Sequence, residues 1–280
     1  MKKLLVLFLF ILYIFYIDYI PCFFFKGVNI WFYKLVPLLF CSFILNDLLL
    51  SSGIIDIIIF YLGRLYYFLF NINPYGLYVL LVSLFCGTPT NAKIIKELLS
   101  LNKIKESDII PMLSTCIFFN PFFILSVSNY KLLICLWVSN ILTAFIFRKY
   151  NGGTYSTYSK QDIKFDLNIS IRNTINILLN ILGIICIFSI ITSILPITNS
   201  FIKGLVIGLL ETTNGIYFIK YTKYNFILLP LFLSFGGLSI YIQIKSILPD
   251  TSLFTKSFIL RRLSVIIITE FLYMLVYLLS

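Results

Sequence analysis

Long apolar runs follow one another along almost the whole chain, and they constrain its fold more than any other feature. About ten runs reach the length of roughly 20 residues that a membrane-spanning helix needs. They lie near residues 4–25, 29–50, 54–70, 75–99, 109–127, 130–147, 171–195, 201–219, 226–247 and 258–279. Hydrophobic residues make up 60% of the 280 residues and charged residues 12%, whereas soluble domains have roughly twice that share of charges. We therefore predict an all-α, polytopic transmembrane helical bundle of about 8–10 segments, located in the cell membrane as a multi-pass protein.

The net charge of +11 comes from lysines and arginines that lie between the apolar runs. This spread is typical of cytoplasmic loops that follow the positive-inside rule, so we expect membrane lipid and no nucleic acid as a partner. With the N-terminus in the cytoplasm, regions 93–108, 148–172 and 220–225 are predicted to be cytoplasmic, and loops 71–74 and 196–200 to lie on the opposite side. The first apolar run has no small-residue cleavage site, and we interpret it as a retained span.

The longest polar segment, 148–168, contains Gly-Gly, Ser, Thr and charged residues. Such a composition is typical of a surface linker. We predict a cytoplasmic linker there, between an N-terminal membrane half (1–147) and a C-terminal membrane half (169–280). The sequence leaves open whether the protein forms a homo-oligomer.

A turn interrupts the apolar run 75–99, and its residues are Gly87, Thr88, Pro89, Thr90 and Asn91. An unpaired backbone group in hydrocarbon costs several kcal/mol, so a broken helix is tolerated where it is buried in protein or lines a watery cavity. The new helix N-terminus, together with the hydroxyl and amide groups, would then suit a small polar solute. The alternative is a kink or a surface loop, with Asn91 as the N-cap of an amphipathic helix.

A second glycine turn interrupts the run 226–247, and its candidate site residues are Gly236, Gly237, Ser239 and Gln243. Aligned without gaps, segments 84–99 and 233–248 match at Gly87 with Gly236 and at Lys96 with Lys245. Paired interrupted helices in two inverted halves are typical of transporters with a site near the bilayer midplane. We therefore predict two inverted halves with broken or re-entrant helices.

Two further polar groups interrupt apolar runs. The carboxylate of Glu211 is followed by Thr212 and Asn214, and an ionisable group inside a span indicates a functional site. Pairing of Glu211 with Lys203 or Lys220 is the structural alternative. Asn120 and Pro121 break the run 109–127, where Asn120 can bond to a neighbouring helix, and a simple kink is the alternative. Glu270 has no polar neighbours, and we interpret it as a structural partner of Arg261 or Arg262.

Several common kinds of chemistry lack their usual residues in this sequence. The chain has no histidine, no pair of its six cysteines has CxxC spacing, and no phosphate-binding GxxxxGK[ST] motif occurs. An intramembrane enzyme usually has paired carboxylates, a histidine or a Ser/Lys pair, and no such motif occurs here. We therefore predict no catalytic residues, no metal site, no cofactor and no enzymatic activity.

Together these motifs resemble the sporulation integral membrane protein family YlbJ. The resemblance begins at "IWFYKLVPLLFCSFIL" (30–45) and continues through Gly87-x-Pro89 and Asn120-Pro121-x-Phe123 to the motifs that begin at Gly208 and Phe235. Members of this family carry the Gate domain, also called the nucleoside recognition domain, which nucleoside transporters and ferrous-iron permeases share. The family motif reads Gly-Tyr-Pro-x-Gly at the first turn, whereas this chain has Thr88 and Asn91 at the second and fifth positions. The resemblance implies a permease-like architecture and a role in forming the spore cortex.

We therefore expect a sporulation-associated membrane protein that binds or moves a small polar solute. Its predicted substrate-binding residues are the fourteen positions of the four interruptions: Gly87, Thr88, Pro89, Thr90, Asn91, Asn120, Pro121, Glu211, Thr212, Asn214, Gly236, Gly237, Ser239 and Gln243. The alternative function is a non-transporting membrane scaffold for sporulation or envelope proteins.

Overall fold

The computed structural model describes the whole chain except residues 1–6, 8–9, 12, 156–164 and 280. The described residues form helices and loops without a strand, which confirms the predicted all-α class. The helices of the N-terminal half are α2 (Ile20–Ile30), the π-helical turn η1 (Trp31–Leu35), α3 (Val36–Ser51), α4 (Ile54–Phe70), α5 (Gly76–Cys86), α6 (Thr90–Ser100), α7 (Glu106–Thr115), α8 (Pro121–Val127), α9 (Tyr130–Ile146) and α10 (Arg148–Asn151). Those of the C-terminal half are α11 (Leu167–Ile194), α12 (Ser200–Leu210), α13 (Thr212–Ile219), α14 (Asn225–Phe235), α15 (Gly237–Ile247) and α16 (Lys256–Leu278).

Three helical segments of the described chain are long and apolar enough to cross a membrane: Ile20–Ser51, Leu167–Ile194 and Asn225–Ile247. This finding supports the predicted membrane location, while the count of eight to ten segments stays a prediction. The first segment joins α2, η1 and α3 into one helix of 32 residues. The sequence predicted a boundary between two spans near residues 25–29, and the structure has a continuous helix there.

Two apolar runs that were predicted to cross the membrane once are folded back as hairpins. Helices α5 and α6 pack against each other, and both ends of the pair lie together: Asn73, before α5, donates to the Lys103 carbonyl, after α6. Helices α12 and α13 also pack together, and the rings of Phe201 and Tyr224 at their open ends are 4.9 Å apart. Counting apolar residues could not reveal these hairpins, because a turn halves the reach of a run without changing its length.

The first hairpin also changes the predicted sidedness of the loops. Loop 71–74 was expected opposite the 148–172 region, yet Gly153 N donates to the Asn71 carbonyl at 3.0 Å and Asn71 Nδ2 donates to the Arg148 carbonyl at 3.3 Å. Loop 71–74 and residues 148–153, the start of the second region, therefore lie side by side. The beginning of the predicted linker is packed as well, since Asn151 is buried and donates to the Phe70 carbonyl.

Two lysines that were expected to mark a cytoplasmic loop are buried in ion pairs instead. Lys103 Nζ lies 2.8 Å from Asp56 Oδ1, and Lys93 Nζ pairs with Asp47 and Glu97. Their charges fix helices to one another, which is why the loop-charge rule does not apply to them.

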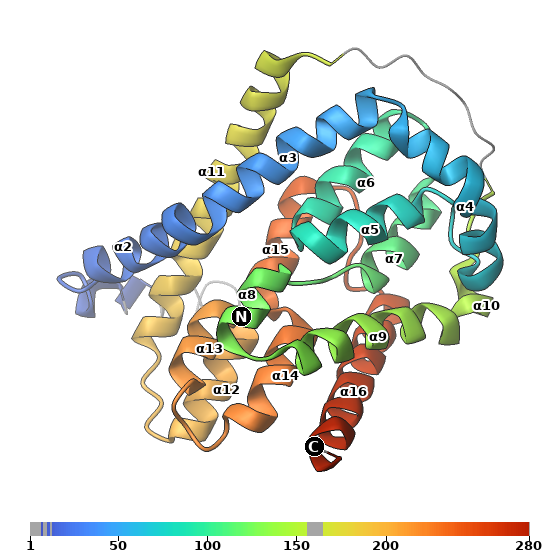
Figure 1. The fold of residues 1–280 in the computed structure, drawn as a ribbon. Coiled ribbons are helices and arrows are strands. Elements are labelled where there is room, and N and C mark those ends of the chain that lie inside the picture. The colour runs from blue at the N-terminus through green and yellow to red at the C-terminus, as the bar shows by residue number, and fades with distance from the viewer. Residues whose placement is uncertain (1–6, 8–9, 12, 156–164, 280) are drawn as a thin grey trace.

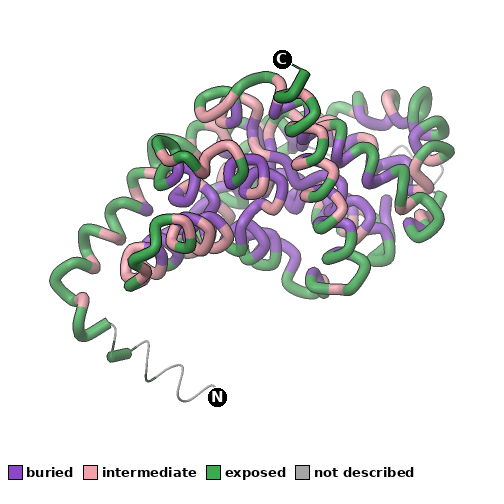
Figure 2. Tube along the Cα trace, turned by 90° about the horizontal axis from the view of Figure 1, so that it is seen from below, coloured by how far each residue is buried: buried purple, intermediate pink, exposed green. Residues whose placement is uncertain are grey.

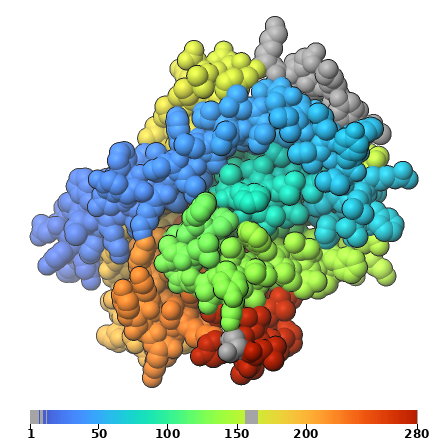
Figure 3. Space-filling view, viewed as in Figure 1, coloured from blue at the N-terminus to red at the C-terminus, as the bar shows by residue number. Residues whose placement is uncertain are grey.

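The hairpins lie against a pair of crossing helices. In Figure 1, α3 (blue) crosses α11 (yellow), and the two are in contact. Figure 3 shows α2 and α3 running across one face beside α5 and α6, which are teal. Trp31 Nε1 in η1 donates to the Leu178 carbonyl of α11 at 2.9 Å and fixes the crossing. Buried residues gather in the centre of the molecule, whereas α2 is exposed along most of its length (Figure 2).

Close approach of two glycines allows the second hairpin to close. A Cβ atom on Gly215 of α13 would lie 2.2 Å from the Cα of Gly208 on α12, so no side chain fits between the helices. The glycines of the sequence motif at residues 208–215 are therefore explained by helix packing.

We predict that Gly215→Ala destabilises the protein by about 1–3 kcal/mol, because the methyl group forces the two helices apart. Gly183→Ala is the matched control, since no atom lies within 4 Å of a Cβ on Gly183 and alanine is the better helix former. Thermal unfolding in detergent measures both variants. Equal midpoints for the two variants would contradict this packing.

Candidate binding site

Four interruptions of the described helices lie at residues 87–89, 116–120, 211 and 236, and they pack in pairs. The first turn lies against the extended segment 116–120. Thr88 N donates to the Phe118 carbonyl at 2.7 Å, Asn91 Nδ2 to the Cys116 carbonyl at 2.8 Å, and Asn120 Nδ2 to the Phe85 carbonyl at 2.7 Å. These bonds satisfy backbone groups that the interruptions would otherwise leave unpaired.

The side-chain amides of Asn91 and Asn120 each donate a hydrogen bond across to the opposite segment. The prediction that Asn120 bonds to a neighbour is confirmed. The interpretation of Asn91 as an N-cap is wrong, because α6 begins at Thr90 and has no side-chain cap. A Cβ atom on Gly87 would lie 2.7 Å from the Asn120 backbone nitrogen, so glycine is required for this contact.

The second pair joins the α12–α13 turn to the α14–α15 interruption. Gly237 has φ of +73°, and a Cβ atom there would lie 2.6 Å from Thr212 Oγ1. Gly236 connects the two pairs, since a Cβ at Gly236 would lie 3.4 Å from Ile117 Cγ2. The four interruptions therefore form one continuous cluster inside the protein.

Glu211 is the link between α12 and α13. Its carboxylate accepts hydrogen bonds from Thr213 N at 3.1 Å and from Asn214 N, and so it caps α13. A carboxylate at a helix N-terminus is stabilised by the helix dipole. The alternative that Glu211 forms an ion pair with Lys203 or Lys220 is wrong, because Glu211 has no ion pair within the described part of the chain.

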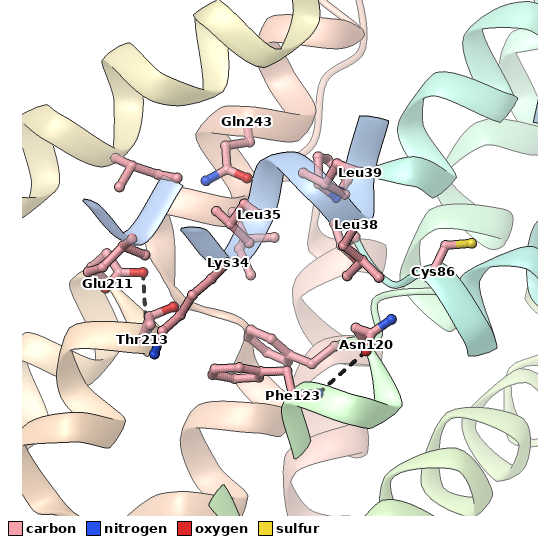
Figure 4. A pocket seen from close by; sticks show the side chains of 16 residues that line it. Lys34, Leu35, Leu38, Leu39, Cys86, Asn120, Phe123, Glu211, Thr213 and Gln243 are labelled. Atoms are coloured by element: carbon pink, nitrogen blue, oxygen red, sulfur yellow. Dashed lines mark hydrogen bonds between the residues drawn. The ribbon is translucent and has the colours of Figure 1, made fainter. Parts of the chain in front are cut away.

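A cavity of about 90 Å³ lies beside three of the four interruptions, and the body of α15 completes its wall. Five of the predicted residues line it. Thr88 and Pro89 come from the α5–α6 interruption, Asn120 from the α7–α8 interruption and Glu211 from the α12–α13 interruption, and Gln243 lies on α15. Figure 4 shows Glu211 and Thr213 on one side of the cavity and Asn120 with Phe123 on another. Leucines of α3 and other apolar side chains form most of the remaining wall.

The other predicted residues do not line the cavity, and they shape the backbone around it: Gly87, Thr90, Asn91, Pro121, Thr212, Asn214, Gly236, Gly237 and Ser239. Several of them carry buried polar atoms without a hydrogen-bond partner among the described residues. These atoms are the hydroxyl oxygens of Thr90, Thr212 and Ser239 and the amide oxygen of Asn214, and the hydroxyl of Thr88 in the cavity wall shares this property. Buried polar groups are normally hydrogen-bonded. Unpaired ones occur at three of the four interruptions, and the Thr88 hydroxyl among them is in the cavity wall, where it can bind a polar ligand.

Sequence reasoning missed Lys34 and Thr213, which also line the cavity. Lys34 is in the π-helical turn η1, and π-helical turns are frequent at functional sites. Its Nζ lies 4.0 Å from the centre of the Tyr217 ring on α13, and in Figure 4 its side chain extends towards Thr213 and Glu211. A lysine inside the apolar run 29–50 was the signal that could have found it.

Arg262 of α16 supports the two helices that end at the cluster. Its side chain is buried and donates to the Ser114 carbonyl in the last turn of α7 at 3.2 Å and to the Ser234 carbonyl in the last turn of α14. Asn140 of α9 accepts a third bond at 3.1 Å. A cation at a helix C-terminus offsets the negative end of the dipole and the unpaired carbonyls. The proposed pairing of Glu270 with Arg261 or Arg262 is wrong, because no such ion pair exists in the described chain.

Comparisons with known protein families, curated proteins and solved structures find no match to this chain. The resemblance to the YlbJ family therefore stays a prediction from the motifs.

We predict that Arg262→Met lowers the thermal midpoint in detergent by roughly 5–10 °C, because two helix-end carbonyls lose a charged donor. Arg172→Met is the control, since Arg172 is exposed and makes no ion pair with a described residue. If both variants unfold like the wild type, Arg262 does not support the broken helices.

Proposed function

We propose that this protein is a membrane permease that binds a small polar solute in the central cavity and moves it across the bilayer. The observation that carries the proposal is the meeting of polar side chains from separate interruptions at one cavity, with Thr88, Asn120 and Glu211 in its wall. Broken helices inside a membrane protein are tolerated where they are buried or line a watery cavity, and transporters use them for binding.

The charges around the cavity favour a solute with both donor and acceptor groups. The N-termini of α6 and α15 begin at the interruptions and supply positive dipole ends. The carboxylate of Glu211 supplies negative charge, and the amides of Asn120 and Gln243 can donate or accept. Arg262 neutralises the C-terminal ends of α7 and α14, so the positive ends are left to act on the solute.

Hollows on two sides support a route through the protein. An outer hollow of about 430 Å³ shares Lys34, Leu38 and Asn120 with the central cavity. A second hollow of about 360 Å³ lies between α6, α11 and α15. Exposed asparagines 173, 176 and 180 of the apolar helix α11 line it, and such side chains avoid lipid.

The first turn of α6 lies between the central cavity and this second hollow. Pro89, just before α6, lines the cavity, and Lys93, one turn later, lines the second hollow. Lys93 is held to α3 by the Phe43 carbonyl at 2.9 Å and by Asp47. In our proposal this ion pair closes the route, and movement of the α5–α6 hairpin opens it.

The order of the helices supports an internal structural repeat, in which each half of the chain has the same sequence of elements. A hairpin, an interrupted helix and a long helix occur as α5–α6, α7–α8 and α9, and again as α12–α13, α14–α15 and α16. We propose that the halves have opposite orientation in the membrane. By element order, the Gly87 turn of the first half corresponds to the Glu211 turn of the second, and the Asn120 segment corresponds to the Gly236 turn. This correspondence replaces the ungapped sequence alignment, which paired Gly87 with Gly236.

The place of the protein in spore formation is the part of the proposal that rests on the family resemblance alone. The motif residues Gly87, Asn120 and Glu211 have structural roles at the interruptions. A permease of a sporulating cell that supplies cortex assembly is consistent with these roles.

Uptake into liposomes tests the proposal, with a panel of neutral, zwitterionic and anionic polar solutes. We expect Glu211→Gln to lower uptake of the accepted solute about 10–100-fold, since a hydrogen bond to a charged group contributes about 1.5–3 kcal/mol. Glu270→Gln is the matched control, because this carboxylate lies in α16 and does not line the cavity.

Two results would contradict the proposal. Equal uptake by the wild type and Glu211→Gln would remove the cavity from the transport route. A scaffold would be favoured if Glu211→Gln and Asn120→Ala were silent in spores while charge reversals in 148–168 abolished function.

A further inference from the structure

A hollow of about 620 Å³ at the end of α4 is rich in positive charge and lies apart from the central cavity. Three basic side chains line it: Arg64 of α4, and Arg148 and Lys149 of α10. Among the described residues, no acidic side chain lines it and none forms an ion pair with any of the three. Lys93 and Lys103, by contrast, are neutralised by ion pairs, so three cations without a described acidic partner distinguish this hollow.

The rest of the lining supplies hydrogen-bond donors and fixes the cations in place. Tyr67 and Tyr155 line the hollow with their rings 5.1 Å apart, and Asn71 contributes its amide. The guanidinium of Arg148 lies 5.3 Å from the centre of the Phe68 ring, which is cation–π distance. The Arg148 carbonyl accepts a hydrogen bond from Asn71 Nδ2, so α10, which presents the cation, is tied to the end of α4.

This combination suits a phosphate group. Arginine binds phosphate with two parallel hydrogen bonds, and lysine adds a point charge. Free phosphate and the headgroup of an anionic phospholipid share this chemistry. The position favours the lipid, because the exposed face of α4 that leads to Arg64 carries Phe60 and Tyr61, and Phe68 follows one turn later. Acyl chains can cover that apolar face while the phosphate reaches the cations.

We propose that this hollow binds the phosphate headgroup of an anionic phospholipid, whose acyl chains lie along α4. Basic pockets beside membrane helices bind anionic lipids in this way, and tyrosines are typical of the membrane–water interface. Bound lipid would fix the ends of α4 and α10, next to the loop at Asn73 from which the α5–α6 hairpin begins. The site does not depend on solute transport, so it can be tested separately.

Binding of phosphatidylglycerol to the full chain in detergent, measured by native mass spectrometry, tests the proposal. We expect the double variant Arg64→Gln/Arg148→Gln to bind this lipid roughly 10–30-fold more weakly than the wild type. The double variant Lys220→Gln/Lys223→Gln is the control, because it removes the same charge from exposed positions elsewhere and should bind normally. Arg64→Lys/Arg148→Lys should keep part of the affinity.

Two further arms identify the source of the phosphate. Phosphatidylcholine should bind weakly and equally to all variants, and inorganic phosphate at millimolar concentration should not displace phosphatidylglycerol. Equal loss of binding in both Gln double variants would reduce the effect to net charge and overturn the proposal. Binding of inorganic phosphate alone at this hollow, without lipid, would also overturn it.

Discussion

The buried guanidinium of Arg262 is the interaction on which the interrupted helices depend. It binds carbonyls at the C-terminal ends of both α7 and α14, and through Asn140 it also holds α9. A helix that ends inside an apolar protein leaves carbonyls and a negative dipole end without solvent, and a cation offsets both. One side chain on α16 therefore allows two helices to stop at the same depth. The turns that follow are then placed next to each other.

Mutual packing of the turns explains how their remaining polar groups are arranged. Backbone groups of the first turn are bonded to segment 116–120, and Gly237 packs on Thr212. The hydroxyl of Thr88 in the cavity wall, by contrast, has no hydrogen-bond partner among the described residues. The backbone is thus stable without a ligand, while the side chains retain capacity to bind one. This division would suit the proposed permease, which must release its solute as readily as it binds it.

Much of this site could be predicted from the sequence, since glycine, proline and a carboxylate inside apolar runs have few structural explanations in a membrane. Gln243 and Asn120 were found in this way, and both line the cavity. Direction of the chain could not be predicted, because a run such as 201–219 has the same composition whether it crosses or turns back at Glu211. Lys34 was missed because its role depends on the π-helical turn and on Tyr217, which is distant in the sequence.

The most direct test of the central claim is a cryo-electron microscopy structure in a lipid nanodisc. The account predicts that the turns at Gly87, Asn120 and Glu211 meet α15 around a hydrated or solute-filled cavity, with the Arg262 guanidinium on the carbonyls of α7 and α14. Turns that are separated from one another, or a cavity filled by acyl chains with Arg262 away from both carbonyls, would contradict it.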